Sequence, residues 1–238
     1  MAIASSTSTS SDVAKAILGE NYITLEEAAW CFRDDLAHDT ARQFARIPFS
    51  AETLGALAST HVLIPDLAVP IRDLRLLVQG NFLRLSQKLE DQGQALQDLL
   101  CFSEDGWYVD LPFAEFPYPT EPPRYRWKLI ARAPLADSYN LGLNDQLKLI
   151  GAERKGNSGH DRIVAARELV YTIVVVLLTR GECLYKEISG RCIDPVTEMQ
   201  RVTAGCSCQK GQIVINQVAE EDRDPKLGLA TARVPNRP

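Results

Sequence analysis

Four cysteines near the C-terminus are the residues whose type and spacing come closest to a chemical site. Cys183 and Cys192 lie nine positions apart, and a single serine separates Cys206 from Cys208. Thiolates gathered in this way could ligate a zinc ion, or two of them could form a redox pair.

The spacing argues against zinc, because tetrahedral sites usually take ligand pairs that are separated by two to four residues. On an extended strand Cys206 and Cys208 point to the same side, about 6.5 Å apart, whereas nine steps put Cys183 and Cys192 on opposite faces unless a bulge at Gly190 intervenes. We therefore expect small, buried, reduced side chains and no metal. A metal site on these four cysteines remains the alternative.

A redox role for Cys206 and Cys208 is also disfavoured. Their Cα separation on an extended strand lies near the upper limit for a disulfide. No helix begins after them to lower the pKa of a thiol, as happens in the Cys-X-X-Cys arrangement.

Few residues are available for histidine-based catalysis or metal binding, since the chain holds three histidines. His160 precedes Asp161, a dipeptide that also occurs in metal-dependent phosphohydrolases. We expect Asp161 to cap a helix instead, with His160 at its exposed approach. The Gly-X-Ser-X-Gly elbow, the Walker loop and the dinucleotide-binding glycine pattern are all absent, so no catalytic or cofactor-binding residue is predicted.

A strand with clear alternation is predicted over residues 124–132. One face carries Tyr125, Trp127 and Leu129, which are ordinary core residues. The other carries three cations, Arg124, Arg126 and Lys128. This basic face could dock an acidic partner, or it could be a solvated face whose charges deter edge pairing.

The elements around these residues indicate an α+β fold, with an N-terminal helical region followed by an antiparallel sheet. Asp12 can cap a helix that ends at Gly19, Thr24 and Glu27 fit a capping box for a helix reaching about Ala45, and Ser50 opens another helix before a strand at 61–65.

A long, buried helix is predicted at about 161–179, ended by Gly181 and packed on the sheet. Beyond Gly181, short runs rich in Val, Ile and Thr predict an antiparallel meander of four strands: 183–193, 199–208, 212–218 and 227–234.

The predicted domain organisation has four segments. These are a disordered N-terminus (1–11), a mainly helical region (12–111), a Pro-rich extended linker (112–123) and an α+β region (124–238) that forms one cooperative unit with the helical region. Leucines and related residues spaced by three and four over 74–99 form a helical seam that could mediate self-association or pack on the core.

Bulk composition limits the function classes. The chain has 238 residues and a net charge of −5, which argues against a nucleic-acid binder. The most apolar run, 169–178, is half of what a membrane-spanning helix needs, and residues 1–12 contain no signal-like apolar stretch, so we expect a cytoplasmic protein.

Several phrases occur in a characteristic order, among them "ILGENYITLEEAA", "IPFSAETL", "RWKLIARAPLADS", "ELVYTIVVVLLTRGECLY" and "GLATAR". Together they resemble a widespread group of bacterial hypothetical proteins, over about residues 14–233. No activity is known for this group, so the resemblance does not suggest one. We expect a non-catalytic binding or structural module of unknown partner. The alternative is a metal-binding protein or hydrolase that uses the cysteines or His160 and Asp161.

Overall fold

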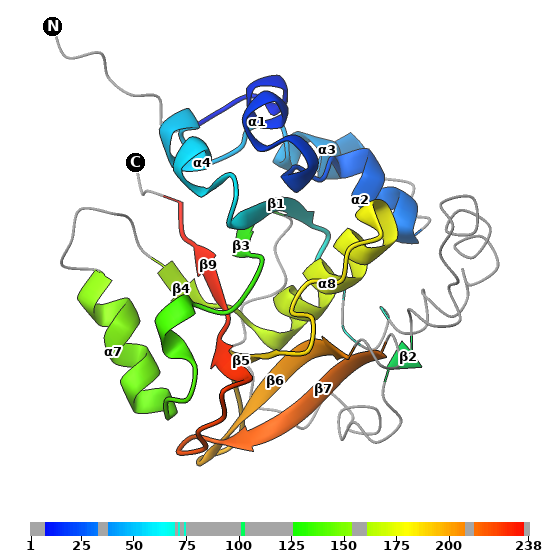
Figure 1. The fold of residues 1–238 in the computed structure, drawn as a ribbon. Coiled ribbons are helices and arrows are strands. Elements are labelled where there is room, and N and C mark those ends of the chain that lie inside the picture. The colour runs from blue at the N-terminus through cyan, green and yellow to red at the C-terminus, as the bar shows by residue number, and fades with distance from the viewer. Residues whose placement is uncertain are drawn as a thin grey trace, which may run out of the picture.

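The computed structural model (Figure 1) has the α+β fold that the sequence predicts. It describes residues 8–32, 38–69, 71, 74, 101–102, 126–153, 161–207 and 212–235. The predicted linker 112–123 and nearly all of the helical seam 74–99 lie outside these residues. Ile71 and Leu74 are helical and buried.

The N-terminal region is helical, as expected. Its elements are α1 Ser11–Leu18, the 3-10 turn η1 Gly19–Asn21, α2 Leu25–Phe32, α3 His38–Gln43 and α4 Ala51–Leu57. The capping box is confirmed, because Thr24 N–H donates to Glu27 Oε2 (2.8 Å) and Glu27 N–H donates to Thr24 Oγ1 (3.1 Å). Ser10, and not Asp12, caps α1.

The first sheet is antiparallel throughout. Its strands, in order, are β1 His61–Asp66, β3 Arg126–Ala131, β9 Thr231–Arg233 and β4 Asp161–Ile163. β4 corrects the prediction that the long helix begins at residue 161. Asp161 and its neighbours pair with β9, so tertiary pairing overrides the local capping signal.

The second sheet is mixed. Its strands, in order, are β2 Cys101–Phe102, β7 Gln212–Ala219, β6 Gln200–Ser207, β5 Ser189–Thr197 and β8 Leu227–Leu229. The meander of β5, β6 and β7 is antiparallel, as predicted, but β8 runs parallel to β5 and β2 parallel to β7. The strand predicted at 227–234 is divided at Ala230, and its second half joins the first sheet as β9.

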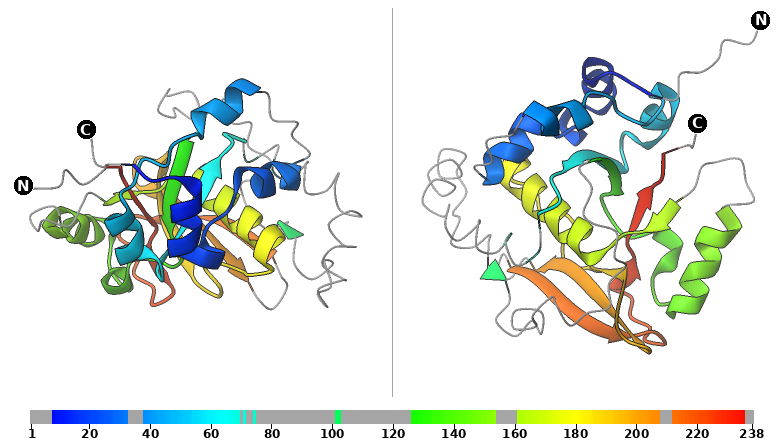
Figure 2. Two further views of the ribbon diagram at one scale, coloured as in Figure 1. Left: turned by 90° about the horizontal axis from the view of Figure 1, so that it is seen from above. Right: turned by 180° about the vertical axis from the view of Figure 1, so that it is seen from behind.

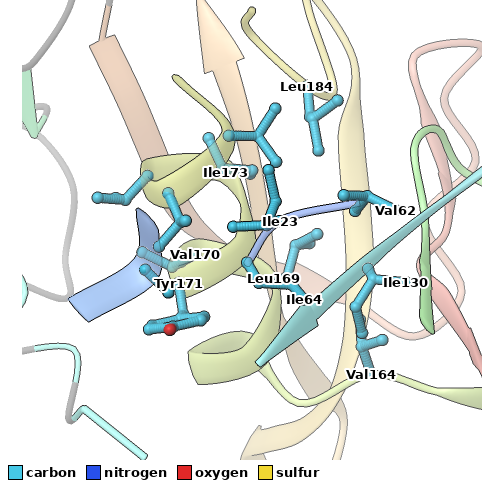
Figure 3. Close-up of a cluster of buried hydrophobic side chains, with 14 of the residues drawn as sticks. Ile23, Val62, Ile64, Ile130, Val164, Leu169, Val170, Tyr171, Ile173 and Leu184 are labelled. Carbon is cyan, nitrogen blue, oxygen red and sulfur yellow. The ribbon is translucent and has the colours of Figure 1, made fainter. Parts of the chain in front are cut away.

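Two further helices complete the fold, α7 Leu143–Glu153 and α8 Ala166–Arg180, with a 3-10 turn η5 at Ala136–Ser138. Twelve of the 15 residues of α8 are buried, and a helix that is apolar on all sides belongs in a core. Figure 3 shows side chains of α8, such as Leu169 and Ile173, among Ile64 of β1 and Ile130 of β3. Gly181 ends α8 in the left-handed region (φ 67°), as predicted.

The layers follow from these contacts. α8 lies between the two sheets, and the helices α1 and α4 lie on the opposite side of β1 and β3 (Figures 1 and 2). On that side Trp127 stacks on Tyr22 and meets Phe44 edge-on. Among the described residues, no helix combines the length and the apolar character needed to cross a membrane.

Candidate functional site

The structure brings two of the four C-terminal cysteines together. Cys183 and Cys206 form a disulfide, with Cα atoms 6.5 Å apart. The expectation of reduced thiols is therefore wrong for this pair. The strand predicted at 183–193 begins only at Ser189, so Cys183 lies in the turn after α8, where it reaches Cys206.

The other candidate ligands do not join this pair. Cys192 is a free, fully buried cysteine on β5, and burial raises the pKa of its thiol well above the usual value. Cys208 lies outside the described residues. Among the residues that the structure describes, no three His, Cys, Asp or Glu side chains are grouped closely enough to hold a metal ion.

The predicted helix cap at Asp161 is also wrong. Asp161 lies in β4, where its Oδ1 accepts a hydrogen bond from Arg233 Nη1 at 3.0 Å. His160 lies outside the described residues.

The polar side chains that do converge lie at the N-terminal end of α8. We call this set the charged cluster; it consists of Asp66, Arg126, Lys128, Arg162, Arg167 and Glu168. Its members come from the end of β1, from β3, from β4 and from the first turn of α8. Antiparallel pairing sets Asp66 opposite Arg126, which places one acid and the cations of β3 on the same side of the sheet as α8.

Glu168 is the centre of the cluster. It is 5% exposed and is bonded to Lys128 Nζ and to Arg162 Nη1 (2.7 Å). Burial raises the pKa of Glu168, but Arg162 and Lys128 outweigh that effect and bring it down to about 2. The carboxylate is therefore ionised at any physiological pH.

Asp66 is the second buried acid, 1% exposed. Arg167 donates to both of its oxygens, at 2.7 and 2.6 Å, a bidentate arrangement that fixes both side chains. Lys128 Nζ lies 3.7 Å from Asp66 Oδ2, so this ammonium connects the two acids.

Lys128 contradicts both predictions for the basic face of β3, but only at its own position. It is only 5% exposed, so it neither faces solvent nor is open to a partner. Arg126 is different, because its side chain is 51% exposed and its guanidinium is 3.8 Å from Glu168. Arg124 lies outside the described residues.

The first turn of α8 is completed by an acid from the second sheet. The N-cap is Ala165, which has no side-chain acceptor. Its N–H donates to Glu168 Oε2 (3.2 Å), and the next N–H, of Ala166, donates to the buried Asp194 of β5. Burial raises the pKa of Asp194 to about 6, although the hydrogen bond from Ala166 opposes this.

Chemically, the cluster presents cations in excess. Four cations surround two carboxylates, and the more exposed side chains are cationic: Arg126 at 51% and Arg162 at 30%, against 2% for Asp66 and 6% for Glu168. An arrangement of this kind can accept a further anion at its rim.

Sequence reasoning missed every acid of the cluster. The sequence signal for these acids is weak. Asp66 follows an apolar stretch, and Glu168 precedes an apolar helical run, where a charged residue is expected to be exposed to solvent. Only the pairing of β1 with β3, and of α8 with both sheets, brings these positions together.

Comparison with known proteins gives no assignment: no protein-family model, no curated protein and no solved structure matches the chain.

Proposed function

We propose that the protein is a non-catalytic interaction module that binds an acidic segment of a partner protein at the rim of the charged cluster. The observation that carries the proposal is the excess of cations, with Arg126 and Arg162 as its most exposed members.

The state of Arg126 supports this proposal. A guanidinium offers five N–H donors, and at 3.8 Å the separation from Glu168 exceeds hydrogen-bonding distance. Arg126 can therefore form a bidentate pair with an incoming carboxylate while the buried members of the cluster stay paired.

The buried members contribute by holding the rim in place. Arg162 is bonded to Glu168, which also binds Lys128, so its side chain is oriented before a partner arrives. Preorganised side chains lose less conformational entropy on binding. Exposed charge pairs are each weak and are screened by salt, so we expect a moderate, salt-dependent affinity.

A fluorescein-labelled hexaglutamate peptide, followed by fluorescence anisotropy, tests the proposal. We expect saturable binding that weakens as NaCl is raised from about 50 to about 500 mM, because salt shortens the Debye length and screens exposed charge pairs. We expect no binding of hexalysine, and an affinity about tenfold lower for Arg126→Gln combined with Arg162→Gln, roughly the effect of losing two exposed pairs.

Arg201→Gln is the matched control, because Arg201 lies on β6, is 24% exposed at its side chain and pairs with Glu220. Equal binding by the double variant and the wild type, or an equal loss in Arg201→Gln, would exclude the rim as the binding surface.

The metal-binding or hydrolytic alternative has less support. Cys183 and Cys206 are bonded to each other and Asp161 to Arg233, so these side chains are occupied by structural partners.

A cytoplasmic location belongs to the same proposal. The free, buried Cys192 supports it, because free thiols are usual where the surroundings are reducing. The disulfide is compatible with that location only if it can be opened and closed, and subcellular fractionation followed by immunoblotting would test the location directly.

A further inference from the structure

We infer that the Cys183–Cys206 disulfide is a redox-sensitive clamp on the segment that joins α8 to β5, and not a staple on which the fold depends. We call residues 181–188 the connector. The inference is independent of the proposed binding site, since the disulfide follows the C-terminal end of α8 and the charged cluster lies at its N-terminal end.

The connector is attached to β6 by its backbone as well as by the disulfide. Cys206 N–H donates to Tyr185 O (3.0 Å), and Glu187 N–H donates to Cys206 O (2.8 Å). Gly205 allows this close approach, because a Cβ at that position would collide with Ile188 O. These contacts do not require the sulfur–sulfur bond, so the chain can keep its path when the bond opens.

The connector is nevertheless a segment that a clamp would stabilise. Tyr185 (φ 56°) and Glu187 (φ 57°) both occupy the left-handed region, which side chains other than glycine rarely adopt. Such conformations persist where surrounding contacts hold them. Both residues flank the position that pairs with Cys206, so loss of the bond removes one of the constraints that hold them.

The bond is reachable from one side. Cys183 is half-buried, whereas Cys206 is 3% exposed. An external thiolate therefore attacks the sulfur of Cys183 and displaces that of Cys206. Cys31 and Cys192, which the structure also describes, are fully buried and do not compete for the bond.

The exchange is a two-electron reaction with a dithiol reductant. One thiolate of the dithiol attacks Cys183 Sγ, the Cys183–Cys206 bond breaks, and Cys206 leaves as a thiolate that takes up a proton. The second thiolate of the dithiol then attacks the mixed disulfide and releases Cys183. In total two electrons and two protons pass to the protein, and the dithiol becomes a disulfide.

The connector also links the two sheets, which gives the clamp a structural consequence. Tyr185 is fully buried and its hydroxyl donates to Ala131 O at the end of β3, while Glu182 pairs with Arg132. Opening the bond loosens the attachment of the connector to β6 and, with it, the junction between β3 and the second sheet.

Hydrogen exchange of the full-length protein, measured by mass spectrometry before and after treatment with dithiothreitol, tests the inference. Alkylation should first identify Cys183 and Cys206 as a linked pair, and dithiothreitol should open this bond without denaturant. We expect the peptides that contain the amides of Glu187 and Cys206 to exchange at least tenfold faster after reduction, with α8 peptides and the far-ultraviolet circular dichroism unchanged.

Two variants make the test specific. Cys183→Ser combined with Cys206→Ser should show the fast exchange under all conditions, whereas Cys31→Ala should keep the wild-type response. The inference is overturned if the native bond resists dithiothreitol, if reduction or the double variant unfolds the chain, or if connector exchange does not change.

Discussion

The two ends of α8 are held in different ways. At its N-terminal end, side chains from both sheets form a set of charges, with Glu168 and Asp194 accepting the first N–H groups of the helix. At its C-terminal end, about 22 Å away, the chain is held by Gly181, by backbone bonds to β6 and by a disulfide. The first end should therefore respond to pH and salt, and the second to thiol reagents.

This difference also separates two kinds of stabilisation. A buried ion pair adds little over an apolar replacement, yet removing one partner leaves an uncompensated charge. A disulfide acts mainly on the unfolded chain, whose entropy it reduces. Mutations at the two ends should thus differ in their pH dependence as well as in their size.

The largest effect is expected for Glu168→Gln. The change leaves Lys128 and Arg162 without their shared carboxylate, and it should lower the free energy of unfolding by about 3–5 kcal/mol at pH 7. Urea denaturation followed by circular dichroism measures this. A loss below about 1 kcal/mol would show that the cluster is effectively solvated.

The same variant should alter the acid limb of stability. Glu168 has a pKa of about 2 in the folded protein and an ordinary value of 4.5, so the unfolded chain binds more protons in this interval. The stabilisation from Glu168 is complete above roughly pH 4.5 and is lost as the pH falls towards 2. Glu168→Gln should remove this slope.

Next in size is the loss of the disulfide at the other end. Cys183→Ser combined with Cys206→Ser should lower the free energy of unfolding by about 3 kcal/mol, given a sequence separation of 23 residues. Wild-type protein in dithiothreitol should give the same value, and the loss should be equal at pH 5 and pH 8. A loss that grows with pH would contradict the contrast between the two ends.

A smaller effect, of opposite sign, is expected for Asp194→Asn. Asp194 has a pKa of about 6 in place of 3.8, so the folded protein binds more protons than the unfolded chain between roughly pH 4 and 6. The free energy of unfolding contributed by this group therefore falls as the pH rises through that interval. The asparagine keeps an acceptor for Ala166 N–H and should be about 2 kcal/mol more stable at pH 8. Thermal melts at pH 4 and pH 8 measure this difference. A variant that is no more stable than the wild type at pH 8 would contradict the prediction.

The smallest effect is expected for Glu182→Gln, in the connector. Its partner Arg132 and Glu182 itself are partly exposed, at 25% and 44% of their side chains, so the loss should stay below about 1 kcal/mol. This variant is the matched counterpart of Glu168→Gln, since each removes one carboxylate from an ion pair with arginine. Similar losses in the two would show that burial does not distinguish the ends of the helix.

Most features that depend on neighbours in the sequence were predicted correctly, although Ser10 and not Asp12 caps α1. The capping box of Thr24 and Glu27, the cap by Ser50 and the terminal Gly181 all act within about one helical turn. The alternation in β3 and the order of helices before sheet were also readable from the chain.

Features that depend on distant segments of the chain were not predicted. Aspartate often caps a helix, which is why a cap was predicted at Asp161. In the structure Asp161 instead pairs with a residue of β9 that lies more than 70 positions away in the sequence. The strand predicted at 183–193 begins only after a turn in which two residues have left-handed backbone conformations. No local sequence pattern predicts that turn.

By itself, the amino-acid sequence determined the elements that short-range hydrogen bonds and hydrophobic periodicity specify, and with them the α+β class. The tertiary structure decided which polar groups meet. Lys128 and Glu168 are 40 residues apart, Asp66 and Arg167 are 101 apart, and Cys183 and Cys206 are 23 apart. The physical reason is that such contacts arise only when sheets and helices pack, and strand order and register are not encoded in the spacing of residues along one segment.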